Sequence, residues 1–318
     1  MYHYVHDRDP LARPGSAGPY GGVHSLGVDA FRRQLDALSR NLEPIDWPGY
    51  YAWTAGRATL PDRCFLLTFD DGLIDHAENV LPILEERGLR GVFFVPTCVL
   101  TTQAMLPAHQ IHLLLSVLDG PELERELRRI LTGRGEAPWC ERLDAKACIA
   151  APAEKMYHYE TPALARLKYW LTMELPLDLC GAALNELFEL HIGSVARWSR
   201  HWYLTWNDLA RMQSLGHTIG GHGHAHLAYT RLSPVEVRLD IRRAGHILQE
   251  GFGPELRPLS FPYGSFSNSA VAACRDAGFV HAFTTQPRWV DGGCDPHRLP
   301  RIDAVNVDLA LREPLACR

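Results

Sequence analysis

The sequence predicts an α/β fold, in which helices wrap a parallel sheet and a helical insertion interrupts the chain. Short apolar runs alternate with amphipathic helical segments toward both ends of the sequence, which is typical of repeated strand and helix units. Between residues 101 and 202 this alternation stops, and the sequence is helical with few strand-like runs. A chain of 318 residues can form a single α/β barrel. We therefore expect a barrel made of residues 1–100 and 203–318, with residues 101–202 as an inserted helical subdomain.

Strand-like runs define the expected sheet. They cover residues 2–5, 64–69, 91–96, 217–220, 258–262 and 279–285. The run at 64–69 is almost wholly apolar, as expected for a strand buried on both faces of a parallel sheet. It ends abruptly in Asp70-Asp71-Gly72, so two carboxylates directly follow a buried strand.

Helices are expected between these strands. One is expected to carry Phe31, Leu35 and Leu38 on one face. The others lie around residues 73–88, 205–216 and 233–250, and within the insertion at 109–118, 121–131 and 162–173. Ser233 begins the clearest of them, because it combines a capping box with Pro234 at the first helical position. Thr205 can cap another helix, and Gly88 and Gly216 suit the left-handed position that follows a helix end.

Composition argues against several classes of protein. The chain is 46% apolar and 22% charged, and no window approaches the roughly 20 apolar residues that a membrane helix needs. A net charge of −5 provides no general attraction to nucleic acid or to an anionic membrane. The eight cysteines include no Cys-x-x-Cys pair, which disfavours a zinc knuckle or a dense disulfide framework. The N-terminus lacks the features of a secretory signal, so we expect a cytoplasmic protein if residue 1 is the native start.

Three clusters of polar residues and glycines follow the ends of expected strands. They are residues 68–72, 219–226 and 260–264. The carboxyl ends of parallel strands in a barrel meet at one mouth, so we expect these clusters to lie together.

Asp70 and Asp71 make up the acidic part of the first cluster. Taken alone, Asp-Asp-Gly is a common turn sequence. Two carboxylates at the end of a buried strand are costly unless something neutralises them, and a metal ion is the usual solution. One carboxylate could then bind the metal while its neighbour takes a proton from the attacking water.

His222 and His226 are four residues apart, a spacing that places both imidazoles on one face of a helical turn and within reach of one ion. The alternative is an exposed histidine-rich loop, but Gly220, Gly221 and Gly223 allow the backbone to approach closely. Two imidazoles and one carboxylate favour Zn²⁺, with a coordination position left for water, although Ni²⁺, Co²⁺ or Mn²⁺ could also be bound.

In their residues and order, the three clusters resemble the motifs of the polysaccharide deacetylase family, also called carbohydrate esterase family 4 or the NodB homology domain. The resemblance covers roughly residues 1–100 and 203–305, and the opening Tyr2-His3-Tyr4-Val5 is similar to the first strand of many members. It implies a deformed (β/α) barrel of about seven parallel strands with one divalent metal.

The same resemblance implies roles for individual residues. Asp70 corresponds to the general base, and the backbone N–H of Tyr263, in Pro262-Tyr263-Gly264, corresponds to a contact with the oxyanion. The implied metal ligands are Asp71, His222 and His226.

The chain also departs from the family pattern. Gly223 stands where many members have Ser or Thr, and Ser260 stands where an arginine is usual, with Arg301 as a candidate replacement for that arginine. The late Leu-x-His motif that supplies a general acid is not recognisable. Candidates for the acid are His224, His297 and, from the insertion, His109 or His112. For each of these histidines the alternative is core or surface packing.

Further residues are expected to contact the substrate. They are Pro262, Trp202, Arg301 and His109. Trp202 belongs to an aromatic stretch between residues 198 and 206, which could stack on sugar rings or pack the insertion against the barrel.

Together these observations predict a hydrolase that removes an N-acyl group, most simply acetyl, from a small intracellular amino sugar, nucleotide sugar or glycoside intermediate. Two alternatives remain open at this point. One is a metal-independent hydrolase of cyclic amides with the same fold, and the other is a carbohydrate-binding relative without catalysis. The sequence indicates no oligomeric state.

Overall fold

The structure is a computed structural model that describes residues 1–7, 23–144 and 149–312. The described residues divide into two compact units. Unit 1 contains residues 1–7, 25–102 and 201–312, and unit 2 contains residues 23–24, 103–144 and 149–200. Along the chain, unit 1 gives way to unit 2 after residue 102 and resumes at residue 201. The division expected from the sequence, into residues 1–100, 101–202 and 203–318, stays a prediction.

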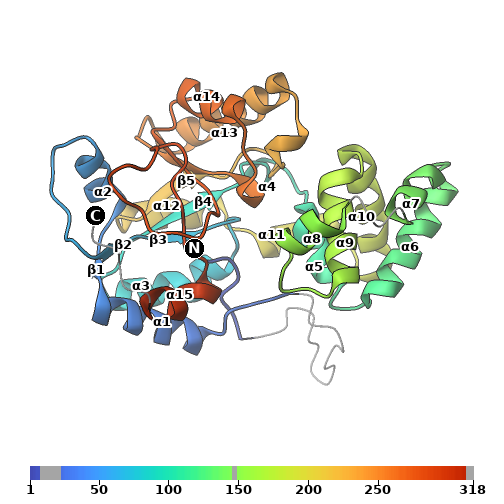
Figure 1. Cartoon of the computed structure of the whole chain (residues 1–318), viewed down its shortest axis with the longest axis horizontal. Helices are drawn as coiled ribbons and strands as arrows, with labels where there is room; N and C mark the ends of the chain where they lie inside the picture. The colour runs from blue at the N-terminus through green and yellow to red at the C-terminus, as the bar shows by residue number, and fades with distance from the viewer. Residues whose placement is uncertain (8–22, 145–148, 313–318) are drawn as a thin grey trace. The chain divides into compact units, whose positions relative to one another are not determined.

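Unit 1 is built on a sheet of five parallel strands (Figure 1). In their spatial order the strands are β3 (Leu67–Phe69), β4 (Gly91–Val95), β5 (Thr218–Gly221), β6 (Pro258–Ser260) and β7 (His281–Phe283). Every residue of β4 is buried, as in a central strand covered on both faces. The fold is therefore α/β, as predicted.

Single bridges extend the sheet at both edges. Tyr2 bridges Phe69 of β3, and Leu299 bridges Phe283 of β7, both in the parallel sense. The N–H of Ala304 then donates to the carbonyl of Met1 at 3.0 Å, which links the two edges. In the described residues the curled sheet therefore has five strands and one bridged segment at each edge, whereas about seven strands were expected from the sequence.

The strand predicted over residues 64–69 is divided between two sheets. Its second half is β3, whereas its first half is β2 (Cys64–Phe65), which pairs with β1 (Glu43–Pro44) in a separate two-stranded sheet. The N–H of Ile45 also donates to the carbonyl of Phe65 at 3.0 Å. The prediction that this apolar run is extended is therefore confirmed. The apolar pattern does not indicate that the run pairs with β1 before Leu66 and with β4 after it.

Helices cover the sheet of unit 1. They are α1 (Val28–Asn41), α2 (Trp47–Thr54), α3 (Leu81–Glu86), α4 (Cys98–Thr101), α12 (Trp206–Ser214), α13 (Pro234–Phe252), α14 (Asn268–Asp276) and α15 (Val307–Arg312). Short helical turns add η1 (His76–Val80), η3 (Tyr229–Arg231), η4 (Pro262–Gly264) and η5 (Ala304–Asn306). Thr205 and Ser233 both cap their helices, as predicted, and both form capping boxes, which had been predicted only for Ser233.

Unit 2 is helical throughout its described residues, as predicted for the insertion. Its helices are α5 (Pro107–Leu114), α6 (Gly120–Gly133), α7 (Ala137–Asp144), α8 (Ala150–Met156), α9 (Pro162–Tyr169), η2 (Trp170–Glu174), α10 (Leu177–His191) and α11 (Val195–Trp202), whose last two residues belong to unit 1. Among the described residues of both units, no helix has the length and apolar character needed to cross a membrane.

Candidate active site

Two carboxylates follow the carboxyl end of β3. Asp70 and Asp71 are both buried, with 2% and 7% of their surface exposed. Asp71 has a φ of 76° and Gly72 a φ of 63°, so the chain turns sharply through the left-handed region. Next to this turn, the N–H of Leu204 donates to the carbonyl of Gly72 at 2.9 Å.

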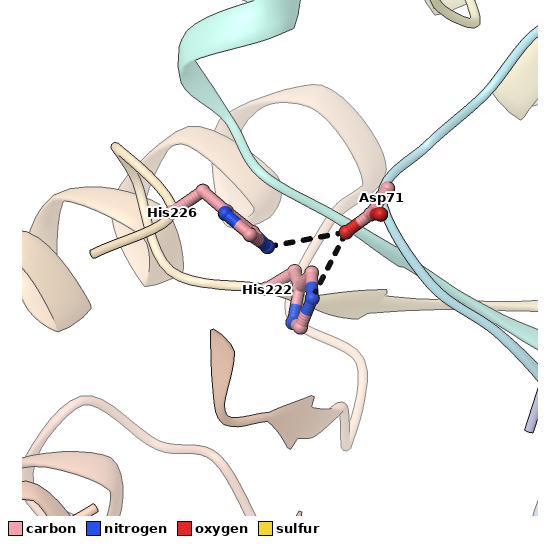
Figure 2. Close-up of side chains that lie close together, drawn as sticks. All are labelled: Asp71, His222 and His226. Atoms are coloured by element: carbon pink, nitrogen blue, oxygen red, sulfur yellow. Dashed lines mark ion pairs between the residues drawn. The ribbon is translucent and has the colours of Figure 1, made fainter. Parts of the chain in front are cut away.

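His222 and His226 follow the end of β5 and face Asp71. Their Nε2 atoms lie 3.3 Å and 3.2 Å from Oδ1 of Asp71, and both rings point toward this carboxylate (Figure 2). One ligand atom from each of the three buried residues lies within 4.8 Å of the other two. The structure thus brings together two segments about 150 residues apart, and the three donors are of the kinds that bind zinc.

The ring of His222 is held in one orientation. Its Nδ1 donates to the backbone carbonyl of Ser260 at 2.7 Å, which leaves Nε2 to face Asp71. This arrangement is usual for histidine ligands, because a hydrogen bond at one ring nitrogen fixes the tautomer that offers the other to a metal. Burial alone would lower the pKa of His222, but Asp70, Asp71 and the Ser260 carbonyl raise it above its ordinary value.

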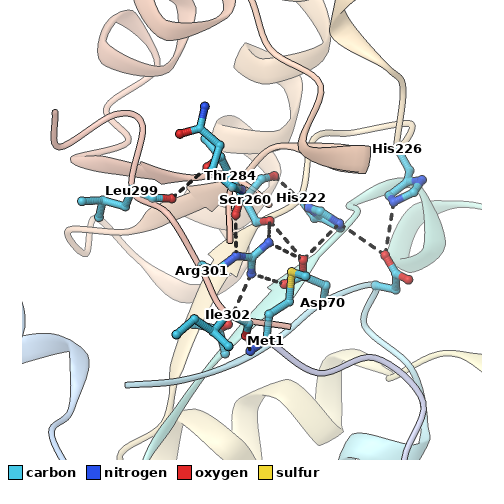
Figure 3. Close-up of polar contacts among 12 residues, drawn as sticks. Met1, Asp70, His222, His226, Ser260, Thr284, Leu299, Arg301 and Ile302 are labelled. Atoms are coloured by element: carbon cyan, nitrogen blue, oxygen red, sulfur yellow. Dashed lines mark hydrogen bonds and ion pairs between the residues drawn. The ribbon is translucent and has the colours of Figure 1, made fainter. Parts of the chain in front are cut away.

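Asp70 is bound on both oxygens by Arg301. Nη1 of Arg301 lies 2.7 Å from Oδ1 of Asp70, and Nη2 lies 2.7 Å from Oδ2 (Figure 3). The Ser260 hydroxyl donates to Oδ2 at 3.1 Å and accepts from Nη2 of Arg301 at 2.7 Å. Ser260, the residue found where the family usually has arginine, therefore contacts the guanidinium of Arg301. That guanidinium lies against Asp70 and is buried, rather than presented to solvent.

This network keeps Asp70 ionised. Burial alone would raise the pKa of its carboxyl, but the charges of Arg301, His222 and His3 outweigh that effect and hold the pKa well below its usual range. A lowered pKa favours the ionised carboxylate, so Asp70 is suited to the role of a base rather than of an acid.

Tyr263 lies at the mouth beside His226. It has a φ of 57° within η4, and its ring centroid is 4.7 Å from that of His226. Pro262, directly before it, is buried. Three residues of the predicted site, Asp71, His226 and Tyr263, are thus the non-glycine residues with positive φ among those that the structure describes. Such backbone strain is often found at functional sites.

Trp202 and His109 are the remaining residues that were expected to contact the substrate. Trp202 is 7% exposed and meets the ring of Tyr4 edge-on at 5.9 Å, which favours packing over stacking on sugar. Its carbonyl accepts from the N–H of Ile74 at 2.9 Å, beside the Asp71 turn. His109 and His112 lie on α5 of unit 2. The contact of His109 with the substrate, and the role of either histidine as the general acid, stay predictions.

His224 and His297, the two candidates for the general acid in unit 1, form hydrogen bonds with residues other than the two site carboxylates. Nε2 of His297 donates to the carbonyl of Phe279, before the amino end of β7, whereas the site lies at carboxyl ends. Nδ1 of His224 is hydrogen-bonded to the hydroxyl of Thr97 at 2.8 Å. Neither contact is with Asp70 or Asp71.

His3 is a histidine of this site that the sequence reading did not single out. The N–H of Asp70 donates to the carbonyl of Tyr2 at 2.9 Å, which places the next residue, His3, beside Asp70. The ring of Tyr2 stacks on that of Phe69, and because side chains alternate along extended chain, His3 faces the side opposite to Tyr2. His3 is half-buried, and Nε2 of His76 donates to its carbonyl at 3.0 Å. The alternation of side chains along residues 2–5 was the sequence signal from which the position of His3 could have been predicted.

Comparison with known families decides the assignment. The sequence profile described as Polysaccharide deacetylase matches residues 57–121 and 190–282, which include the Asp70-Asp71 turn, both site histidines and Pro262-Tyr263-Gly264. The chain belongs to the polysaccharide deacetylase family. A polysaccharide deacetylase is a hydrolase that acts on amide bonds of acetylated carbohydrates, and these enzymes generally use a divalent metal. No curated protein matches the sequence at a significant level.

Solved structures show the same fold. The Streptococcus pyogenes deacetylase PplD in complex with acetate superposes with a TM-score of 0.57 at 14% identity, over 99% of this chain and 96% of that one. IcaB from Ammonifex degensii superposes with a TM-score of 0.57 at 16% sequence identity, over 98% of this chain and 95% of that one. A de-N-acetylase from Aggregatibacter actinomycetemcomitans superposes with a TM-score of 0.56 at 16% sequence identity, over 95% of this chain and 93% of that one. At these identities the likeness establishes the polysaccharide deacetylase fold alone.

Proposed function

We propose that this chain is a metal-dependent deacetylase that removes the acetyl group from an N-acetylated amino sugar. The observation that carries the proposal is the buried group of Asp71, His222 and His226, whose ligand atoms lie within 4.8 Å of one another. Two imidazoles and one carboxylate suit Zn²⁺ best, and this set resembles catalytic zinc sites in which a fourth position stays open.

Asp70 is the proposed general base. It lies next to the metal ligands, with Oδ2 3.9 Å from Nε2 of His222, and it is ionised because of Arg301. The bound metal would act as a Lewis acid toward the acyl carbonyl and would lower the pKa of water. Asp70 accepts the proton of the water that attacks the acyl carbon, and the two-point contact with Arg301 keeps its carboxylate in one orientation.

Two further groups complete the proposed mechanism. The backbone N–H of Tyr263 donates to the oxyanion that forms at the acyl carbon, a contact that stabilises transition states by about 3 to 4 kcal/mol. His3 is the proposed general acid, which protonates the leaving amine. This assignment is supported by its position beside Asp70, its partial exposure and the effect of its charge on the Asp70 carboxyl.

The proposed substrate is a small N-acetylated amino sugar, nucleotide sugar or glycoside intermediate inside the cell. The described cysteines support this choice. All of them are free thiols, which is typical of proteins in a reducing compartment.

A test is to measure acetate release over a panel that contains monomeric N-acetyl sugars, nucleotide sugars and β-linked N-acetylglucosamine oligomers. Activity should disappear when a chelator removes the metal and return when Zn²⁺ is added. His226→Ala should lose both metal and activity. His246→Ala is the matched control, because His246 is exposed and its ring pairs with Glu250 at 3.2 Å on the surface of the same helix. Full activity of metal-free protein would contradict the proposal, and a preference for the oligomers would contradict the small substrate.

A further inference from the structure

A buried carboxylate on α13 holds the loop between His222 and His226. Oδ2 of Asp240 accepts the backbone N–H of His224, and Oδ1 accepts that of Ala225, both at 2.9 Å. The hydroxyl of Tyr229 donates to Oδ2 at 2.8 Å. Asp240 therefore receives three hydrogen bonds, two of them from residues that lie between the proposed metal ligands. It takes no part in the chemistry described above.

The opposite side of this loop is also held. The carbonyls of Gly223 and His224 accept the backbone N–H groups of Thr97 and Cys98 at 3.1 Å and 2.9 Å. These contacts follow β4, the strand that pairs with both β3 and β5. The loop ends at His226 in the left-handed conformation, which persists only where the surroundings determine it.

The space beside Gly223 explains why no larger residue stands there. A Cβ atom at this position would lie 2.6 Å from Oη of Tyr229 and 2.9 Å from Oδ2 of Asp240, and the φ of Gly223 is 70°. A serine or threonine at position 223 would therefore collide with the phenol and the carboxylate. These two groups occupy the space that the side-chain hydroxyl of many family members would need.

We propose that Asp240, supported by Tyr229, is a positioning residue that fixes His226 relative to Asp71 and thereby sets the affinity for the metal. The proposal rests on the function proposed above. A carboxylate suits the position because three donors converge on it and each needs an acceptor. An asparagine would turn its NH₂ group toward one of those donors, so the loop would lose at least one bond and gain a repulsive contact.

The test compares wild type, Asp240→Asn, Tyr229→Phe and Ile241→Ala. Zn²⁺ affinity is measured by competition with a chromophoric chelator. Asp240→Asn should bind zinc about 10 to 100-fold more weakly, as is usual when a group that orients a ligand is lost. Its acetate release should fall at limiting zinc and recover at saturating zinc. Tyr229→Phe keeps both backbone bonds, so its loss of affinity should be smaller. Ile241→Ala is the control, because Ile241 is buried on the same helix. It should lower the unfolding midpoint without changing zinc affinity.

A second readout does not depend on the metal. Hydrogen exchange of the His224 and Ala225 amides in the metal-free protein should be faster in Asp240→Asn than in wild type, with the amides of β4 as internal reference. If Asp240→Asn keeps both wild-type zinc affinity and wild-type exchange, this inference is wrong while the proposed function stands. If the wild-type protein binds no zinc, the proposed function and the metal part of this inference both fail.

Discussion

Arg301 binds both carboxylate oxygens of Asp70 although the two residues are 231 positions apart in the chain. The contact is made where the last edge segment of the barrel meets the first, beside β3. Both side chains are withdrawn from water. Each buried charge is therefore stabilised by the other. The ion pair also connects the proposed catalytic base to the segment that closes the barrel.

Removal of Arg301 should destabilise the protein. Arg301→Gln would leave Asp70 as an uncompensated buried charge, and breaking such a pair costs about 3 to 5 kcal/mol. Urea unfolding followed by circular dichroism would measure this loss. The double variant Arg301→Gln, Asp70→Asn should recover much of it, because no charge then remains unpaired. Equal stability of the single and double variants would show that the loss does not come from the unpaired carboxylate.

Asp70→Asn should remove the base but leave the metal in place. Acetate release should fall by about 10²- to 10⁴-fold, the range expected for general-base catalysis. Zinc content should stay at the wild-type level, because the proposed ligands are Asp71, His222 and His226. Single-turnover acetate release and elemental analysis measure the two effects separately. Near-normal release from the zinc-loaded variant would assign the base to another group.

His3→Gln should change the pH dependence of the reaction. A general acid must be protonated, so wild-type activity should fall at alkaline pH, and this limb should vanish in the variant together with about 10²-fold or more of kcat. His6→Gln is the matched control, since His6 lies three residues further on and pairs with Asp75 at 2.7 Å. The measurement is kcat from pH 5 to 10. An unchanged alkaline limb in His3→Gln would assign the acid to another residue.

His281→Phe should reduce the loss of stability at acid pH. Burial, and then the charge of His297, lower the pKa of His281 to about 4, against about 6.5 in an unfolded chain. The unfolded state therefore binds the proton first, and stability is lost as the pH falls from 6.5 toward 4. The rings of Trp47, Tyr50 and Tyr51 lie 5.3, 5.8 and 5.7 Å away, so phenylalanine suits the site.

Thermal unfolding at pH 7.5 and pH 5 measures this effect. The midpoint should shift less in His281→Phe than in wild type. Other buried histidines keep their own contributions in both proteins. If the two shifts are equal, His281 does not contribute to the pH dependence.

The sequence allowed the core of the site to be predicted because its signals are local. Apolar runs mark β3 and β4, and the polar residues that follow the expected strands stand at strand ends whatever the details of packing. The structure brings Asp71 and the two histidines together as this reasoning expects. The capping boxes at Thr205 and Ser233 are equally local, because a cap involves only four consecutive residues.

Other features depend on contacts between distant segments and could not be read from the pattern. Arg301 was considered only as a replacement for the arginine of the family motif, since nothing near it in the sequence indicates that it reaches Asp70. His3 was overlooked because its importance arises when Tyr2 pairs with the β3 segment. The division of residues 64–69 between two sheets depends on β1, a two-residue strand that carries no apolar signal.

The left-handed backbone at Asp71, His226 and Tyr263 has a consequence for engineering. Glycine would adopt this backbone conformation with less strain than any of these residues, since the left-handed region costs L-residues about 1 to 2 kcal/mol. Directed evolution that screens heat resistance alone would thus reward replacements at Asp71 and His226, the proposed metal ligands, and we expect such replacements to abolish turnover. Tyr263 differs, because its proposed contribution comes from the main chain and survives loss of the ring. It is the position among the three where thermostability can be gained with the least damage to the chemistry.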